Sequence, residues 1–555
     1  MRRISVLGIG FLLLMFLSLG VIVTAQQARC EEFQASTAVM PAPVQEVLSR
    51  TAPPPMSEQR LAQLEFWSDN TTLPGPLLGQ GAPAAGPMPG TESVPERQRS
   101  MEPMLPETST LLRLLNLPIV PVGFASHVME SSVASEGKYN FYTGNWFAAR
   151  SINGGATWAH VSPFPGWPAH NPFCCDQITI PDKARTRLFW LRMSSPGTNP
   201  VGGNYENLFK LSVSADGGLT FLTYTFAPVN TNNTWTNQWW DYPHIQLGAR
   251  YMYLAWNMFN QAGSWTRTVM LRLPLDALAA GAGFSYSYYQ TSSWFTFVPA
   301  QGCDHTMYWA SNWPNTSPQN SRIAIWKWDE DSASISAVVK TVAAWTATGR
   351  GQALCGAAAG NWAARYDQRV LTGARYSIMN TNLKVPGRKV LGWWWNVGQG
   401  GSFAKPYIDA AAFYEDTWAA AVPLTQVAGL QGRPFVWSST ICFAYPAASV
   451  NERGDVGMVF NYSTGTALNP SVAYAISDDY TAAPPGWNSF LNVRTSLTRP
   501  SDNKWGDYNT SRPFFPSSEV WAAASHYLPT ATAVPIYFVF GRGRDVNSWT
   551  RWNTK

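Results

Sequence analysis

The stretch Ser214-Ala215-Asp216-Gly217-Gly218-Leu219-Thr220-Phe221 describes a tight turn between two β-strands. The Asp carboxylate can accept backbone N–H groups across such a turn, and Gly tolerates the positive φ that the turn requires. The aromatic residue then anchors the second strand in a core. A second copy, Ser151-Ile152-Asn153-Gly154-Gly155-Ala156-Thr157-Trp158, has Asn in place of Asp. The sequence therefore predicts two equivalent hairpins.

A longer period surrounds these hairpins. Four Asp residues stand just before strand-like runs, with spacings of 65, 63 and 63 residues: Asp176, Asp241, Asp304 and Asp367. Two looser matches follow at Tyr445 and Asp507. A unit of roughly 60 residues with four short strands is the size of one blade of a β-propeller. A β-sandwich would also be rich in strands but would not repeat an acidic residue at a fixed interval.

The composition agrees with an all-β fold. Only 13% of the 555 residues are charged while 14% are aromatic, and the chain has 43 Gly and 41 Pro. Many aromatic and turn-forming residues with few charges are typical of short strands joined by tight loops. We predict a β-propeller of seven blades, or six if the C-terminal segment completes the first blade. The expected blade starts are His127, Asp176, Asp241, Asp304, Asp367, Tyr445 and Asp507.

The two hairpin sequences resemble the Asp box, or BNR repeat, of sialidases and other secreted propellers. The resemblance implies that residues 125–555 form a sialidase-like β-propeller and that the boxes lie on outer hairpins, away from an active face. Sialidases hold the substrate carboxylate with three arginines, the first in an Arg-Ile-Pro motif before the first box. The segment Pro121-Val122-Gly123-Phe124-Ala125-Ser126-His127 has no such motif. The chain is therefore not expected to be a typical sialidase.

The N-terminus has the features of a secretory signal. Arg2 and Arg3 precede an uncharged run from Val6 to Val23, and Val23-Thr24-Ala25 offers small residues for cleavage. We predict that residues 1–25 are a signal peptide; the alternative is an uncleaved anchor, since the run approaches the length that spans a bilayer. Residues 26–124 are rich in Pro and Ala and are predicted to be a largely disordered linker. The protein should be secreted or associated with the cell surface, with no further membrane span.

Charge and cysteine content limit the partners. The formal net charge is +5 including the two signal arginines, and no basic stripe suggests nucleic acid. Six cysteines are too few for a small disulfide scaffold. Adjacent Cys174 and Cys175 could bridge each other only with strain, so bonds to distant partners are expected. No cofactor is required, a structural Ca²⁺ is considered because carboxylates recur, and we expect a monomer.

The acidic blade starts are the candidate site. The innermost strand of a propeller blade begins at the face that usually carries the ligand, and two carboxylates there could act as the acid and the base or nucleophile of glycoside hydrolysis. A neighbouring His could tune protonation. The alternative is that each Asp only stabilises its own turn. The candidate catalytic residues are Asp176, Asp241, His244, Asp304, His305 and Asp507.

Two functional hypotheses follow. The first is a glycan-directed propeller, either a glycoside hydrolase or a carbohydrate-binding protein, whose partner is an extracellular carbohydrate or glycoprotein. The predicted export, the aromatic content and the Asp-box resemblance favour it. The second is a non-catalytic adhesion or protein-interaction scaffold, which the missing catalytic signature and the long predicted linker favour. Convergent carboxylates would indicate the first, and Asp residues bonded only to their own backbone would indicate the second.

Overall fold

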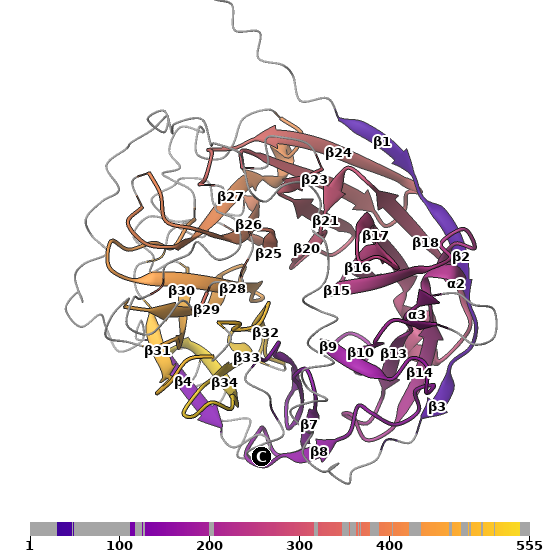
Figure 1. Cartoon of the computed structure of the whole chain (residues 1–555), viewed down its shortest axis with the longest axis horizontal. Helices are drawn as coiled ribbons and strands as arrows, with labels where there is room; N and C mark the ends of the chain where they lie inside the picture. Colours follow the sequence, from indigo (N-terminus) through magenta and orange to yellow (C-terminus); the bar gives the residue numbers. More distant parts are fainter. Residues whose placement is uncertain are drawn as a thin grey trace, which may run out of the picture.

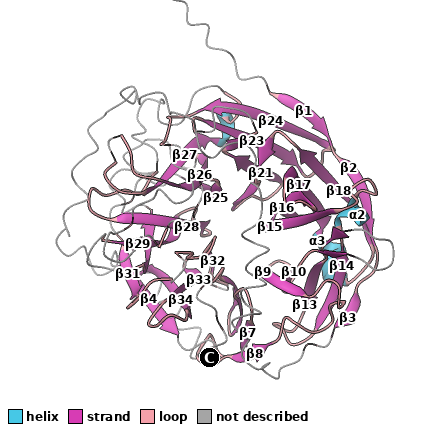
Figure 2. Cartoon of the chain, viewed as in Figure 1, coloured by secondary structure: helices cyan, strands magenta, loops and turns pink. Residues whose placement is uncertain are grey.

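A computed structural model shows short antiparallel sheets arranged in a ring (Figure 1), with strands as the dominant element (Figure 2). This confirms the predicted all-β propeller. Residues 1–25, the predicted signal peptide, lie outside the described residues. The structure describes residues 30–46, 48, 111–116, 125, 128–198, 205–315, 320–346, 355, 362–363, 366, 368–377, 388–401, 403–420, 434–464, 469–478, 487, 490–500, 503–515, 517–543 and 545.

The first three antiparallel groups, which we call blades A, B and C, follow each other along the chain. Blade A contains β5 (Ser132–Glu136), β6 (Tyr139–Thr143), β7 (Ala148–Ser151) and β8 (Ala159–Val161). Blade B contains β9 (Phe173–Asp182), β10 (Arg187–Ser194), β13 (Phe209–Ser214) and β14 (Phe221–Phe226). Blade C contains β15 (Gln238–Leu247), β16 (Tyr251–Asn260), β17 (Trp265–Pro274) and β18 (Phe284–Thr291). In each blade the chain starts at the innermost strand.

Four further groups, blades D to G, continue the ring. Blade D contains β20 (Val298–Gln301), β21 (Thr306–Ser311), β23 (Arg322–Asp329) and β24 (Ser334–Thr341), and blade E contains β25 (Val370–Ser377), β26 (Lys389–Val397) and β27 (Tyr407–Tyr414). Blade F contains β28 (Cys442–Val450), β29 (Val456–Ser463), β30 (Ser471–Ser477) and β31 (Leu491–Thr495). Blade G contains β32 (Thr510–Pro513), β33 (Trp521–Tyr527), β34 (Val534–Arg542) and β4 (Leu111–Asn116). Blades D and E join into one sheet through a short parallel pairing of β20 with β25.

Small elements fill the connections. Two ribbons pair β11 (Gly197–Thr198) with β12 (Tyr205–Glu206), and β19 (Trp294–Phe295) with β22 (Trp313–Pro314). Short helices with described bounds include α2 (Pro228–Thr231), α3 (Leu275–Ala280) and η4 (Glu415–Thr417). Among the described residues, no helix is long and apolar enough to cross a membrane.

Tryptophan fills much of the space between blades. In blade C, Trp240 and Trp256 stack with their ring centroids 4.8 Å apart, and Phe209 of blade B packs on Trp256 at 5.0 Å. The largest fully buried side chains are all tryptophans: Trp190, Trp235, Trp240, Trp256, Trp309, Trp326, Trp328, Trp362, Trp393, Trp394, Trp395 and Trp505. The aromatic content of the sequence therefore serves the core of the ring.

Part of the predicted linker is not a linker. Residues within 26–124 form β1 (Glu31–Gln34), β2 (Ser36–Met40) and β3 (Val44–Glu46), which pair with the outermost strands of blades D, C and B. Figure 1 shows this strap running along the outer rim of the ring. It forms because the outer strand of a blade leaves unpaired backbone groups that another strand can bond. The same predicted linker supplies β4, which pairs with β34 and joins an N-terminal segment to the last blade.

A buried ionic contact anchors the strap to blade B. The Glu46 carboxylate lies 2.6 Å from Arg192 Nη2 and 3.0 Å from Lys210 Nζ, and it accepts a hydrogen bond from Thr223 Oγ1 at 2.8 Å. Burial alone would raise the pKa of Glu46, but the two cations lower it below its ordinary value. Arg192 is fully buried and lies 4.1 Å from the Trp190 ring centroid. The strap thus neutralises charges that blade B buries.

The two box-like sequences adopt equivalent turns between the last two strands of blades A and B. Ser214 Oγ accepts from Gly218 N at 2.8 Å, and Asp216 Oδ1 accepts from Thr220 N at 2.9 Å. In the other copy the corresponding bonds are Gly155 N to Ser151 Oγ at 2.8 Å and Thr157 N to Asn153 Oδ1 at 2.9 Å. Both turns use two glycines with positive φ. Their position on the outer hairpins is the one expected from the sequence.

Buried asparagines tie successive blades together near the starts of the inner strands. Asn207 of blade B exchanges two hydrogen bonds with the backbone of Trp240 in blade C, at 2.9 and 2.7 Å. The same kind of contact recurs at the next three junctions, formed by Asn257 with Thr296, Asn312 with Val370, and Asn396 with Tyr445. At the junction after these, the side-chain amide of Asn509 donates to that of Asn461 at 2.7 Å. These amides satisfy backbone or side-chain groups where the strand ladders end.

We predict that Glu46→Ala lowers the free energy of unfolding by about 3–5 kcal/mol, because it leaves Arg192 buried without its carboxylate. Denaturant unfolding of the variant and the parent measures the difference. Glu32→Ala is the matched control, since Glu32 lies exposed on the same strap and should change stability by less than about 0.5 kcal/mol. Equal small effects of the two substitutions would contradict this account of the strap.

Candidate active site

Three inner strands each have a β-bulge near their start. In β9, β15 and β28, two consecutive residues drop out of the antiparallel ladder: Cys175-Asp176, Tyr242-Pro243 and Tyr445-Pro446. The first residue of each pair has a positive φ, of 51°, 56° and 56° respectively. This conformation is uncommon for residues other than Gly and turns the chain out of the sheet. Side chains at these bulges can therefore point toward the mouth of the ring.

The bulges show that the register expected from the sequence is wrong. Asp176 occupies the second bulge position, which is Pro243 in blade C, whereas Asp241 precedes its bulge. The two Asp residues are thus not at equivalent positions, although their carboxyl groups interact. The spacing of the Asp residues does not reveal this difference in position. Loops of unequal length between blades can give equal intervals in sequence even when the two Asp residues occupy different positions in their strands.

Four carboxyl groups gather where the inner strands begin, and we call them the acidic cluster: Glu130, Asp176, Asp241 and Asp507. Glu130 lies just before β5 and Asp507 just before β32, so blades A, B, C and G each contribute one. The Glu130 and Asp176 side chains hydrogen-bond to each other. Gly506, with a φ of 135°, lets the chain approach here, since a Cβ would collide with the Met129 carbonyl oxygen. The cluster therefore draws on first, last and intermediate parts of the chain.

The cluster holds protons that isolated carboxylates would lose. Burial, with the charge of Asp507, raises the pKa of Glu130 to about 7. Burial and the neighbouring charges of Glu130 and Asp241 raise the pKa of Asp176 well above its ordinary value. Burial raises the pKa of Asp241 to about 6, although a backbone hydrogen bond from Tyr242 and the charge of Arg369 lower it. Near neutral pH the site therefore contains both a protonated and an ionised carboxyl group.

Cationic and aromatic groups surround these acids. Arg369, immediately before β25, lies 3.5 Å from Asp507 through Nη2 and 3.8 Å from the Tyr242 ring centroid. Lys504 lowers the pKa of Glu130 and Asp241 by its charge. Burial and Arg369 lower the pKa of His244 to about 3, so its imidazole is neutral at physiological pH. The His244 ring packs edge-on against Tyr242 in this shell, with their ring centroids 4.9 Å apart.

Two polar atoms of this shell are buried without a hydrogen-bond partner among the described residues: His244 Nε2 and Tyr508 Oη. The negative charges of Asp176 and Glu130 add to burial in raising the pKa of Tyr508 well above its ordinary value, so the phenol keeps its proton. Buried polar atoms of native proteins normally bond to protein, water or a ligand. The shell thus has hydrogen-bonding capacity for a polar ligand.

Asp304 and His305 do not belong to the site, contrary to the prediction. Both lie in the turn after β20, at the end of the inner strand rather than its start. The Asp304 carbonyl oxygen accepts a hydrogen bond from Ala249 N at 3.1 Å, beyond the far end of β15 from Asp241. About eight residues of strand separate these positions, or roughly 25 Å. Asp304 is exposed 3.7 Å from Arg375, and His305 lies 3.4 Å from Glu330.

Three of the Asp residues predicted from the sequence share one site. Asp176, Asp241 and Asp507 lie together in the acidic cluster, and Asp367 lies outside the described residues. Sequence reasoning missed Glu130, which falls outside the repeated pattern, and Arg369, whose neighbour Asp367 drew attention instead. Among the described residues, no group of three or more His, Cys, Asp and Glu side chains is arranged to hold a metal ion.

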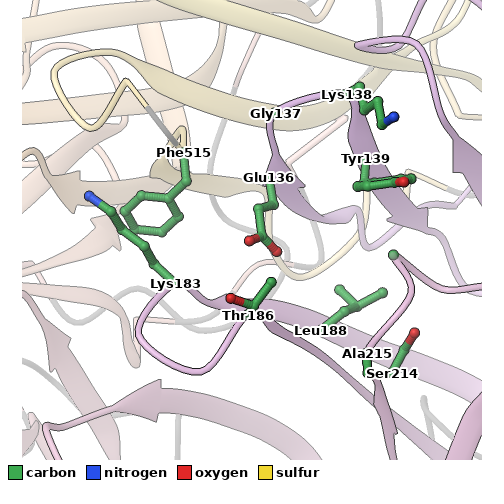
Figure 3. Close-up of a pocket in the computed structure, with 11 residues that line it drawn as sticks. Glu136, Gly137, Lys138, Tyr139, Lys183, Thr186, Leu188, Ser214, Ala215 and Phe515 are labelled. Carbon is green, nitrogen blue, oxygen red and sulfur yellow. The ribbon is translucent and has the colours of Figure 1, made fainter.

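A separate pocket lies near the far ends of the inner strands of blades A and B (Figure 3). Glu136, Lys183 and Phe515 line it, together with the turn at Ser214. Lys183 bonds to Glu452 at 2.6 Å and to Ser518 Oγ at 3.0 Å. Glu136 is the only carboxylic acid among the lining residues. The pocket therefore lacks the paired carboxyl groups that distinguish the acidic cluster.

No family model and no curated protein matches the chain. Solved structures with similar folds include a Penicillium chrysogenum alpha-L-arabinanase complexed with arabinobiose, with 10% identity, a TM-score of 0.32, and coverage of 77% of this chain and 98% of that chain. The GH93 alpha-L-arabinofuranosidase of Fusarium graminearum has 9% identity, a TM-score of 0.36, and coverage of 77% and 97%. Trypanosoma rangeli sialidase has 9% identity, a TM-score of 0.35, and coverage of 76% and 59%. Identities this low say nothing of activity, so the site must be interpreted from its own residues.

We predict that the acidic cluster destabilises the fold as pH rises. With the pKa of Glu130 at about 7 and that of Asp241 at about 6, the folded state binds more protons than the unfolded state between about pH 4 and 7. Stability contributed by these protons is present at low pH and lost through that window. The free energy of unfolding of Glu130→Gln, relative to that of the parent, should therefore rise by about 3 kcal/mol between pH 4 and pH 8. Thermal unfolding across this range measures it, with Glu32→Gln as the control; parallel pH curves for Glu130→Gln and the parent would contradict it.

Proposed function

We propose that this chain is a glycan-directed propeller that hydrolyses glycosidic bonds at the acidic cluster. The observation that carries the proposal is the hydrogen-bonded pair of the buried Glu130 and Asp176 beside the part-buried Asp241, by which carboxyl groups from three blades keep different protonation states. An Asp that merely stabilised its own turn would bond to nearby backbone, as Asp216 does. Asp176 instead bonds to a carboxyl group of another blade.

The protonation states suggest the roles. Burial and the charge of Glu130 raise the pKa of Asp176 well above its ordinary value, so Asp176 would donate a proton to the leaving oxygen of a glycoside. Asp241, with a pKa of about 6, would be ionised and would act as the base or nucleophile. Glu130 would hold Asp176 in position through their hydrogen bond, and the proton that Asp176 gives up would be restored from the water consumed in each turnover. Acid and base with separated pKa values are what this chemistry requires at one pH.

The charge of the site favours a neutral or amino sugar. The charges of Arg369 and Lys504 already act on carboxyl groups of the cluster, since both lower the pKa of Asp241, so an anionic sugar would compete with these carboxyl groups for the two cations. Arg369 is also engaged with Asp507. This supports the expectation that sialic acid, whose recognition would need a cationic clamp, is not the substrate. The predicted export would bring the site to extracellular carbohydrate.

We predict that the exported protein releases reducing sugar from one or more members of a panel of neutral glycosides and polysaccharides, and not from a sialylated substrate. Asp176→Asn and Asp241→Asn should each lower the rate by about 10²–10⁴-fold, because each removes a proton-transfer group. Release of reducing ends, followed at pH 5 to 8, measures the rate.

Asp304→Asn is the matched control, since Asp304 carries the same side chain in the predicted repeat but lies at the far end of the inner strands. It should keep the parental rate. Binding of a glycan without release, lost in Asp241→Asn, would replace hydrolysis with carbohydrate binding. Neither binding nor release across the panel would overturn the proposal in favour of a non-catalytic scaffold.

A further inference from the structure

Cys174 and Cys175, adjacent in sequence, are joined by a disulfide, and Cys355 pairs with Cys442. The expectation that the adjacent cysteines would bond to distant partners is wrong. The bulge of β9 brings this about. Cys174 pairs with Met193 as the last residue before the bulge, and Cys175, the first residue of the bulge, has a positive φ of 51°. The disulfide thus closes a small ring over the first half of the bulge, and Asp176 is the next residue.

We propose that the Cys174–Cys175 disulfide is a positioning element of the site, which holds the β9 bulge in the form that brings Asp176 to Glu130. The inference deepens the proposed function and rests on it for its catalytic consequence. Neither cysteine would contact substrate. Their role would be to restrict the backbone that carries the proton donor.

Comparison of the bulges supports this role. In blades C and F the residue that follows the positive φ is Pro243 or Pro446. Proline suits a bulge because it has no N–H to pair and its ring restricts the chain. In blade B this position must carry a carboxyl group, so it cannot be proline. The disulfide supplies the missing restriction from the residue before.

The surroundings of Asp176 fix the bulge on both sides. The disulfide is buried against Trp146 and Phe173, at the contact between blades A and B. On the other side, the fully buried Gln177 donates to the carbonyl oxygens of Gly144 and Phe147, at 2.5 and 3.1 Å, and accepts from Trp190 Nε1 at 2.9 Å. Asp176 is therefore the one position between two fixed neighbours. Loosening either neighbour would let its carboxyl group leave Glu130.

The same arrangement makes the site sensitive to reduction. A dithiol such as dithiothreitol would attack one sulfur, form a mixed disulfide, and then close to its own cyclic disulfide. The protein gains two electrons and two protons as the two cysteine thiols, and the dithiol loses them. The cysteines are 1% and 4% exposed, so reduction should be slow in the folded protein. Substitution reaches the same state without that barrier.

The test is the variant Cys174→Ser/Cys175→Ser, alone and combined with Asp176→Asn. We expect the cysteine variant to lose glycosidase activity about as much as Asp176→Asn does, by about 10²–10⁴-fold, and the triple variant to lose no more. Its unfolding should also lose part of the pH dependence between pH 4 and 7, because Asp176 leaves the cluster. Cys303→Ser is the control, because it removes a buried cysteine next to Asp304, at the far end of the inner strands, and should keep both properties.

The two readouts separate the outcomes. If the cysteine variant unfolds with a flattened pH dependence but the parent has no glycosidase activity, the positioning role is supported and the proposed function is overturned. Parental activity and pH dependence in the cysteine variant would overturn the positioning role. Should the variant not fold, slow reduction of the folded parent by dithiothreitol, with thiols counted by mass spectrometry, should cause the same loss of activity; full activity with these two thiols free would overturn the inference.

Discussion

The structure depends on how each inner strand satisfies its backbone where its ladder ends. Four successive blade junctions solve this with a buried amide, as when Asn396 accepts the N–H of Tyr445 at 2.7 Å. A backbone group left unpaired there would cost about 1–3 kcal/mol. Because the asparagine belongs to the preceding blade, each tie also fixes the angle between two blades. The mouth of the ring is thereby rigid enough to hold side chains from several blades in one place.

The protein treats buried charge in two opposite ways. At the rim, Glu46 meets Arg192 and Lys210 and each charge finds a partner. At the mouth, carboxyl groups meet each other, and burial shifts their pKa values upward rather than pairing them. Such a cluster works against folding at neutral pH, so the surrounding structure must hold it in place. Unfavourable placement of this kind is common where titratable groups serve chemistry.

The sequence predicts the fold better than the site, for physical reasons. Turn chemistry is local, so residues 151–158 and 214–221 reveal their hairpins directly. Register is not local: Asp304 keeps the interval of the repeat yet falls after its inner strand instead of before it. The blade ties escaped notice because asparagines such as Asn257 and Asn312 recur at irregular intervals. The strap could not be seen either, since its pairing partners lie hundreds of residues away, as with Glu32 and Ser336.

The location of the acidic cluster follows from the closure of the ring. Glu130 enters the first blade and Asp507 enters the last, so these acids come together only when blades A and G meet. That seam is bonded by Tyr142 Oη to the Ser525 carbonyl oxygen at 2.7 Å and by Thr510 Oγ1 to the Ser131 carbonyl oxygen at 2.8 Å. Repulsion within the cluster opposes closure, and the seam contacts offset it. If the seam were open, Asp507 would be separated from Glu130. Closing the ring therefore also assembles the site.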